Sequence, residues 1–267
     1  MTRARRATLI QWGVFAGGLA LVAALLVPTV SWRDLRDSFF DWKILTDQFP
    51  LIVTEGIRNT LIYTAIAFSA GLVFGLVAAL MRQSSVTPAR WLAGTYIEFF
   101  RSIPALLTIL LVGFGIPIAF SDYNLPGFFR STYGKGGLAL ALVAGAYMAE
   151  TIRAGIEAVP RGQTEAARSL GMTGTQTMRS IVLPQAFRVV IPPLTNELLL
   201  LLKDTSLLAV LGVAIGEREL TTFGKLASNR VANPTPLTAA AICYVVITIP
   251  LTLLVRRVER RSKAGTR

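Results

Sequence analysis

The chain of 267 residues is 53% hydrophobic and only 16% charged, with a mean hydropathy of +0.56, which excludes an ordinary soluble domain and indicates an integral membrane protein. Its formal net charge of +12 does not point to nucleic acid, because the basic residues cluster beside apolar runs and no nucleic-acid-binding motif accompanies them. Histidine is absent and the one cysteine lies in an apolar run, so no disulfide framework within the chain is possible.

The first predicted element is an apolar run at residues 9–30, preceded by three arginines. It is long enough to cross a hydrocarbon core of about 30 Å, and no small-residue cleavage site follows it. We therefore expect a retained span with a cytoplasmic N-terminus rather than a signal peptide. Residues 31–55 mix both charge signs with aromatic residues, which is typical of a connector on the outer side.

Apolar runs further along the chain predict five more spans. They cover residues 56–81, 91–120, 137–156, 189–212 and 238–255. In the second span, Gly71 and Gly75 have the spacing that lets two helices approach closely. In the third, Pro104 is one of several residues that interrupt the apolar run.

Arginine-rich connections orient these spans. The loop at 82–90 and the tail after residue 256 are basic and therefore expected in the cytoplasm, whereas the loops at 121–136 and 216–236 are expected outside. The predicted fold class is an all-α integral membrane protein with six transmembrane helices and both termini in the cytoplasm.

A polar stretch, EAARSLGMTGTQTMRSIVLP at residues 165–184, separates the fourth and fifth spans. It predicts two short helices. The first covers 163–170 and is closed by Gly171 as a left-handed C-cap, and the second begins near Thr173 or Thr175 and runs to Pro184. The charge pattern places this turn in the cytoplasm.

The spacing within this stretch resembles the EAA loop of bacterial ABC importer permeases: EAA, three residues, G, nine residues, I-x-LP. The seven matching residues are Glu165, Ala166, Ala167, Gly171, Ile181, Leu183 and Pro184. The resemblance implies that the loop is a coupling helix, which docks in a groove of a cytoplasmic ATPase subunit. The alternative is an ordinary amphipathic connector between two spans.

Other segments resemble the polar-amino-acid branch of these permeases; they lie at residues 96–104, 146–150 and 202–207. The similarity covers roughly residues 54–257 and omits the first span. It implies the MetI-like permease fold of a type I importer. The expected division is an extra span with its connector (1–55), a permease core (56–257) containing the coupling segment (160–184), and a basic cytoplasmic tail (258–267).

The resemblance also implies an assembly in the bacterial inner membrane. Two permease subunits, identical or homologous, would pair within the lipid, two cytoplasmic ATPase subunits would use ATP-Mg, and an external amino-acid-binding protein would touch the outer loops. The chain itself would form the translocation path and would be neither an enzyme nor the holder of a cofactor or metal. In agreement, its two Gly-Lys pairs are not followed by Ser or Thr, so it carries no P-loop.

Ionisable residues within predicted spans are costly and are therefore functional candidates. Glu98 and Arg101 lie three residues apart and can pair on one helix face, either to contact substrate or to fix the helix end. Glu150 and Arg153 repeat this spacing at the inner end of the fourth span, where a structural or coupling role is favoured.

Polar residues also interrupt the leucine-rich fifth span; they are Asn196, Glu197, Lys203, Asp204 and Ser206. Glu197 and Asp204 are seven apart and share a face, while Asn196 and Lys203 form a second pair about 100° round the helix. Such a stripe can accept from an amino acid's ammonium and donate to its carboxylate, so we expect the substrate path here. Support of an outer gate is the alternative for the same residues.

Two other classes of function compete with this interpretation. A secondary transporter or channel subunit driven by an ion gradient would need coupling groups and usually an inverted repeat, and neither is found. A membrane enzyme would need a catalytic constellation, and the sequence offers no histidine and no evident acidic metal cluster.

Overall fold

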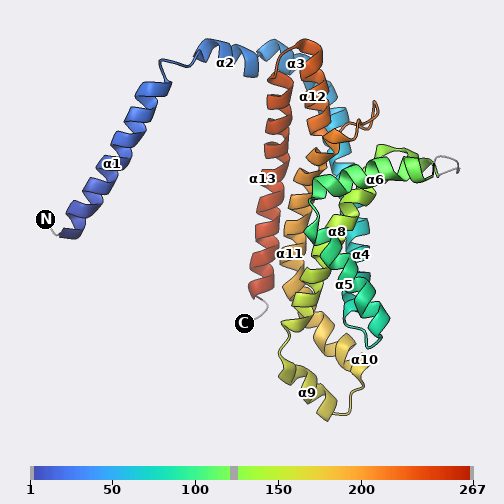
Figure 1. Cartoon of the computed structure of the whole chain (residues 1–267). Helices are drawn as coiled ribbons and strands as arrows, with labels where there is room; N and C mark the ends of the chain where they lie inside the picture. The colour runs from blue at the N-terminus through green and yellow to red at the C-terminus, as the bar shows by residue number, and fades with distance from the viewer. Residues whose placement is uncertain (1–2, 121–125, 265–267) are drawn as a thin grey trace.

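The computed structural model describes residues 3–120 and 126–264, in which every regular element is a helix. In chain order these are α1 (Arg3–Leu26), α2 (Trp32–Phe39), α3 (Trp42–Leu51), η1 (Ile52–Ile57), α4 (Arg58–Arg82), α5 (Thr87–Ser102), α6 (Ala105–Ala119), α7 (Gly127–Arg130), α8 (Thr132–Glu157), α9 (Arg161–Ser169), α10 (Gly174–Thr177), η2 (Met178–Val182), α11 (Leu183–Asp204), η3 (Thr205–Val210), α12 (Leu220–Val231) and α13 (Thr235–Ala264). Most of the long helices run side by side in one bundle, with α2 and α3 across one end and α9 and α10 projecting from the other (Figure 1). The predicted all-α class is confirmed.

The centre of the bundle is the pair α4 and α8, which run in the same direction. Gly71 and Gly75 of α4 face α8 so closely that a Cβ on Gly75 would lie 2.8 Å from the Cβ of Met148. Tyr63 and Met148 are fully buried beside this contact. The prediction that the two glycines allow close packing of helices is confirmed.

The predicted third span is two helices rather than one. α5 ends at Ser102, Ile103 is extended with ψ 134°, and α6 begins after Pro104. A residue before proline is sterically pushed out of the helical region, so the chain turns here, and α5 and α6 meet at 108°. The interruption was predicted at Pro104, but the size of the bend was not.

Hydrogen bonds fix residues 216–218 to the bundle. The Asn59 side chain donates to the carbonyls of Gly216 and Arg218 at 2.8 and 3.0 Å, and the Tyr63 hydroxyl donates to the Glu217 carbonyl at 3.1 Å. Arg218 also forms an ion pair with Glu55, at 2.8 Å. Residues 216–218 are therefore held against α4 and η1.

The predicted outer loop at 216–236 is largely a helix, because the carboxylate of Glu219 accepts hydrogen bonds from the backbone amides of Thr221 and Thr222 and so caps α12. The predicted loop at 121–136 is also shorter than expected. Its residues 121–125 lie outside the described part of the chain, the short helix α7 follows, and α8 already begins at Thr132.

The connector at 31–55 is helical too. Asp41 caps α3 through the Ile44 amide, and Thr235 at the start of α13 holds the junction of α2 and α3 by accepting from the Asp41 amide and donating to the Ser38 carbonyl. α1 lies apart from the bundle (Figure 1), and its three glycines have nothing within 4 Å of a would-be Cβ.

By length and composition, three helical stretches among the described residues can cross a membrane, and the bent pair α5–α6 would make a fourth. The three are Trp32–Arg82, Thr132–Glu157 and Thr235–Arg257. Gln11–Leu26 is a shorter apolar helix, and α11 does not qualify. The count of six spans therefore stays a prediction.

Candidate functional site

A cavity of about 530 Å³, which we call the central cavity, lies at the break between α5 and α6, where α8 and α11 also line it. The break supplies Arg101, Ser102 and Pro104, and α8 supplies Tyr147. Glu197 and Asp204 enter from α11, where their separation by seven residues puts both on one helix face. The cavity thus brings together one cation, two carboxylates and an aromatic ring within an apolar bundle.

Arg101 is oriented by an aromatic neighbour. Its guanidinium carbon lies 5.6 Å from the centroid of the Tyr147 ring, the geometry of a cation–π contact. Glu197 and Asp204 are half-buried opposite. Such a set can bind a ligand that carries both an anionic and a cationic group.

The predicted pairing of Glu98 with Arg101 is wrong. No ion pair joins them among residues 3–120, because the Arg101 side chain turns toward Tyr147 of α8. Glu98 instead lines a second cavity, which runs along α5 from Thr87 to Ser102. The pairing of Glu150 with Arg153 is confirmed, and Arg153 also contacts Glu157 at 2.5 Å.

The structure separates the polar residues of the fifth span. Asn196 and Lys203 are exposed and do not line the central cavity, and neither does Ser206, which belongs to η3. Only the face of Glu197 and Asp204 opens onto it. Sequence reasoning missed Tyr147 as a site residue, although it lies in the segment 146–150 whose resemblance was noted.

The polar segment after α8 is a compact turn at the end of the bundle (Figure 1). α9 ends just before Gly171, whose φ of 84° confirms the predicted left-handed cap. Thr173 then opens α10 with a capping box, since its hydroxyl accepts from the Gln176 amide and the Gln176 side chain accepts from the Thr173 amide. Both ends of the turn are thus fixed by local hydrogen bonds.

The predicted coupling residues of this segment differ in their exposure to solvent. Glu165 and Ala166 are exposed, whereas Ala167 is buried against the rest of the turn. Sequence reasoning did not single out Leu170, whose side chain is 84% exposed. An isolated leucine presented beside Glu165 and Ala166 suits contact with another protein.

The predicted end of the second short helix at Pro184 is wrong. α10 passes through the π-helical turn η2 into α11, so the helix continues without a stop, and α11, which contains the predicted fifth span, begins at Leu183 rather than at residue 189. Pro184 lies where the π-helical turn η2 passes into α11, and it has no amide hydrogen to donate there. Ile181 and Leu183 are half-buried in this junction. The turn and α11 are therefore one connected element.

Comparison with known proteins gives a consistent assignment. The family described as "Binding-protein-dependent transport system inner membrane component" matches residues 71–264. The probable glutamine ABC transporter permease protein GlnM of Bacillus subtilis (strain 168) is 39% identical over 219 residues, which are 82% of this chain and 96% of that protein. The glutamine transport system permease protein GlnP of Escherichia coli (strain K12) is 34% identical over 226 residues, 84% of this chain and 98% of that one.

A solved structure described as an amino acid ABC transporter with histidines superposes with a TM-score of 0.71 at 36% identity, covering 81% of this chain and 96% of that one. These matches do not favour the ion-gradient-driven alternative. The chain belongs to the family of inner membrane components of binding-protein-dependent transport systems, and it is the permease subunit of an ABC importer.

Proposed function

We propose that this permease carries amino acids and that its substrate path passes through the central cavity at the α5–α6 break. The observation that carries the proposal is the placement of Arg101 together with Glu197 and Asp204 around one cavity. The similar proteins include glutamine permeases and an amino acid transporter, and they support the same class of substrate.

The chemistry of the cavity fits a zwitterion. Arg101 offers planar N–H donors to a carboxylate, and Glu197 or Asp204 accepts from an ammonium. Tyr147 holds the guanidinium from the α8 side, so the donor is positioned before substrate arrives. The other predicted path residues, Asn196, Lys203, Ser206 and Glu98, lie outside this cavity.

Coupling to ATP hydrolysis would run through α9. In this proposal the exposed residues Glu165, Ala166 and Leu170 dock on a cytoplasmic ATPase subunit. That subunit, and not the permease, binds ATP-Mg. The buried Ala167 and the positive φ of Gly171 keep the turn rigid. Because α10 is continuous with α11 through η2, movement of the turn would shift Glu197 and Asp204 as well.

The external partner would meet the opposite end of the bundle. Ile215 is 88% exposed between Gly212 and Gly216, both of which have positive φ. An exposed isoleucine on a loop anchored by Asn59 and Tyr63 suits contact with an amino-acid-binding protein. The residues before Trp32 remain outside this scheme, and we assign α1 to packing in lipid or against a second permease.

In this proposal the chain lies in the bacterial inner membrane with both termini in the cytoplasm. It consists of an extra span with its connector (1–55), the permease core (56–257) and a basic tail (258–267). Residues 265–267 lie outside the described part of the chain.

The test is ATP-driven uptake of radiolabelled amino acids into liposomes that hold the permease with its ATPase and binding protein. We expect Glu197→Gln to reduce uptake at least tenfold without loss of assembly, since it removes a cavity acceptor. The matched control is Asn196→Ala, one residue away and outside the cavity, which should transport at close to the wild-type rate. Unchanged uptake and selectivity in Glu197→Gln would place the path elsewhere.

A further inference from the structure

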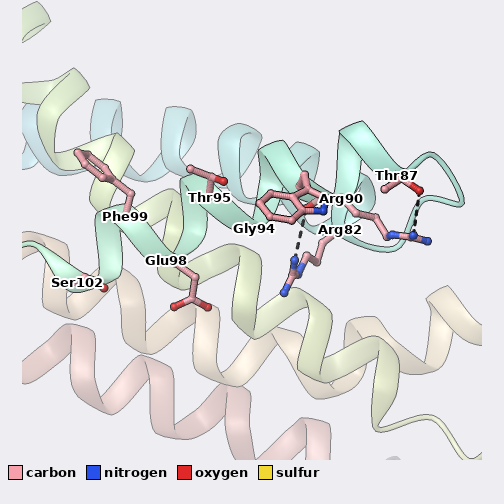
Figure 2. A pocket seen from close by; sticks show the side chains of 9 residues that line it. Arg82, Thr87, Arg90, Gly94, Thr95, Glu98, Phe99 and Ser102 are labelled. Carbon is pink, nitrogen blue, oxygen red and sulfur yellow. Dashed lines mark hydrogen bonds between the residues drawn. The ribbon is translucent and has the colours of Figure 1, made fainter.

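A second cavity, of about 710 Å³, runs along one face of α5 from Thr87 to Ser102, with Arg82 of α4 at its side (Figure 2). Ser102 also lines the central cavity. Ser102, the last residue of α5, thus lines both cavities, and the second extends from there toward the loop between α4 and α5.

The groove is long enough to reach from the middle of a hydrocarbon core to its surface. At 1.5 Å per residue the helix from Thr87 to Ser102 is about 22 Å long, and half of a hydrocarbon core is about 15 Å. A ligand that left the central cavity at Ser102 would follow the groove to the end of the bundle that carries the coupling segment.

Two residues of opposite charge, Arg82 and Glu98, line the groove. The Arg82 side chain crosses α5 at Gly94, where a Cβ would lie 2.4 Å from its Nη1. Glu98 lies one helical turn, about 6 Å, further along and projects on the same side as Arg82 (Figure 2). Among the residues that the structure describes, Glu98 has no hydrogen-bond or ion-pair partner, and the Arg82 guanidinium makes one long hydrogen bond, to the Arg90 carbonyl at 3.4 Å.

We propose that this groove is a second, weaker amino-acid site, which substrate occupies between the central cavity and the cytoplasm. Arg82 donates to the substrate carboxylate, Glu98 accepts from its ammonium, and the rings of Trp91 and Phe99 flank its side chain. The inference rests on the proposed function, because the groove receives substrate from the central cavity.

An anionic phospholipid headgroup is the other ligand that arginines near a membrane surface attract. The negative charge of Glu98 would repel the phosphate of such a headgroup. A lipid site also gives no reason for the groove to share Ser102 with the central cavity. Arg90 is also less available than Arg82, because its guanidinium donates to the Ser84 carbonyl and the Thr87 hydroxyl. These contacts favour a zwitterion over a phosphate.

The test is equilibrium dialysis of the complete permease–ATPase complex, without binding protein, against a radiolabelled mixture of the twenty proteinogenic amino acids. We expect two classes of bound amino acid on the wild type. Arg82→Gln and Glu98→Gln should each reduce the affinity of the weaker class at least tenfold and leave that of the tighter class unchanged. Glu197→Gln should reduce the affinity of the tighter class and leave that of the weaker class unchanged. Lys43→Gln, on the outer helix α3, controls for loss of charge, and Arg82→Lys and Glu98→Asp should retain both classes within a few-fold if the variants are folded.

A single class on the wild type, or two classes that respond to neither groove variant, would overturn the inference. So would unchanged amino-acid binding accompanied by loss of co-purified phosphatidylglycerol from Arg82→Gln, which would make the groove a lipid site. If the groove variants act as expected while Glu197→Gln changes nothing, the groove stands and the central cavity is refuted.

Discussion

A Cβ added to Gly155 of α8 would lie 2.0 Å from Cγ2 of Val190 in α11, so these two helices touch through a position that has no room for a methyl group. Valine is stiff at χ1 and cannot swing its methyl group aside without cost. We expect Gly155→Ala to destabilise the permease by about 1–3 kcal/mol, as overpacked cores do.

Thermal unfolding of the purified permease in detergent measures this effect. Val190→Ala removes the clashing methyl, so the double variant should be more stable than Gly155→Ala alone. Gly162→Ala is the matched control, because nothing lies within 4 Å of a Cβ there. Equal melting temperatures for Gly155→Ala and the wild type would contradict the close contact.

The ring of Tyr147 is expected to hold Arg101 in position for the substrate carboxylate. Tyr147→Leu removes a cation–π contact of about 0.5–2 kcal/mol, which corresponds to a 2- to 30-fold rise in the KM of uptake. Tyr147→Phe keeps the ring and should stay near the wild-type KM. The idea fails if leucine and phenylalanine at this position behave alike.

Gly171 is expected to determine how well the coupling segment binds the ATPase. A side chain at φ 84° costs about 1 kcal/mol or more, and valine would displace α9 from α10. Gly171→Val should therefore co-purify with less ATPase while inserting normally into the membrane. Gly171→Asn should retain most of the ATPase, because asparagine tolerates the left-handed region; full ATPase binding by the valine variant would show that the turn need not be rigid.

Single-cysteine labelling can determine the orientation of the chain in the membrane. In a Cys243→Ser background, Thr175→Cys in α10 should resist an impermeant thiol reagent added to intact cells, and Ile215→Cys should react with it. Both positions are exposed in the structure, so a difference in labelling reports the side of the membrane. Labelling at position 175 from outside the cell would contradict the predicted orientation.

Features set by local spacing could be predicted from the sequence. Gly171 was recognised as a left-handed cap because its conformation depends on the residues next to it, and Glu197 and Asp204 were placed on one face by helical periodicity alone. The close approach of Gly75 to another helix likewise followed from its spacing to Gly71.

Features that depend on a second helix could not be predicted in this way. Whether Arg101 pairs with Glu98 on its own helix or turns to Tyr147 on α8 is decided by tertiary packing. The passage of α10 into α11 past Pro184 was missed because a π-helical turn has no sequence signature comparable to that of a proline stop. The polar composition of residues 216–236 predicts a loop, because it does not reveal the cap at Glu219.

The polarity of α11 has a consequence for how the protein is made. This helix carries Arg188, Glu197, Lys203 and Asp204, and it is not among those apolar enough to cross a bilayer unaided. An acidic or basic residue near the middle of a lone helix opposes its partition from the translocon into lipid by about 2.5–3.5 kcal/mol. α8, synthesised first, offers α11 a protein surface instead of lipid at Val190. We therefore expect α11 to enter the membrane packed against α8 rather than alone.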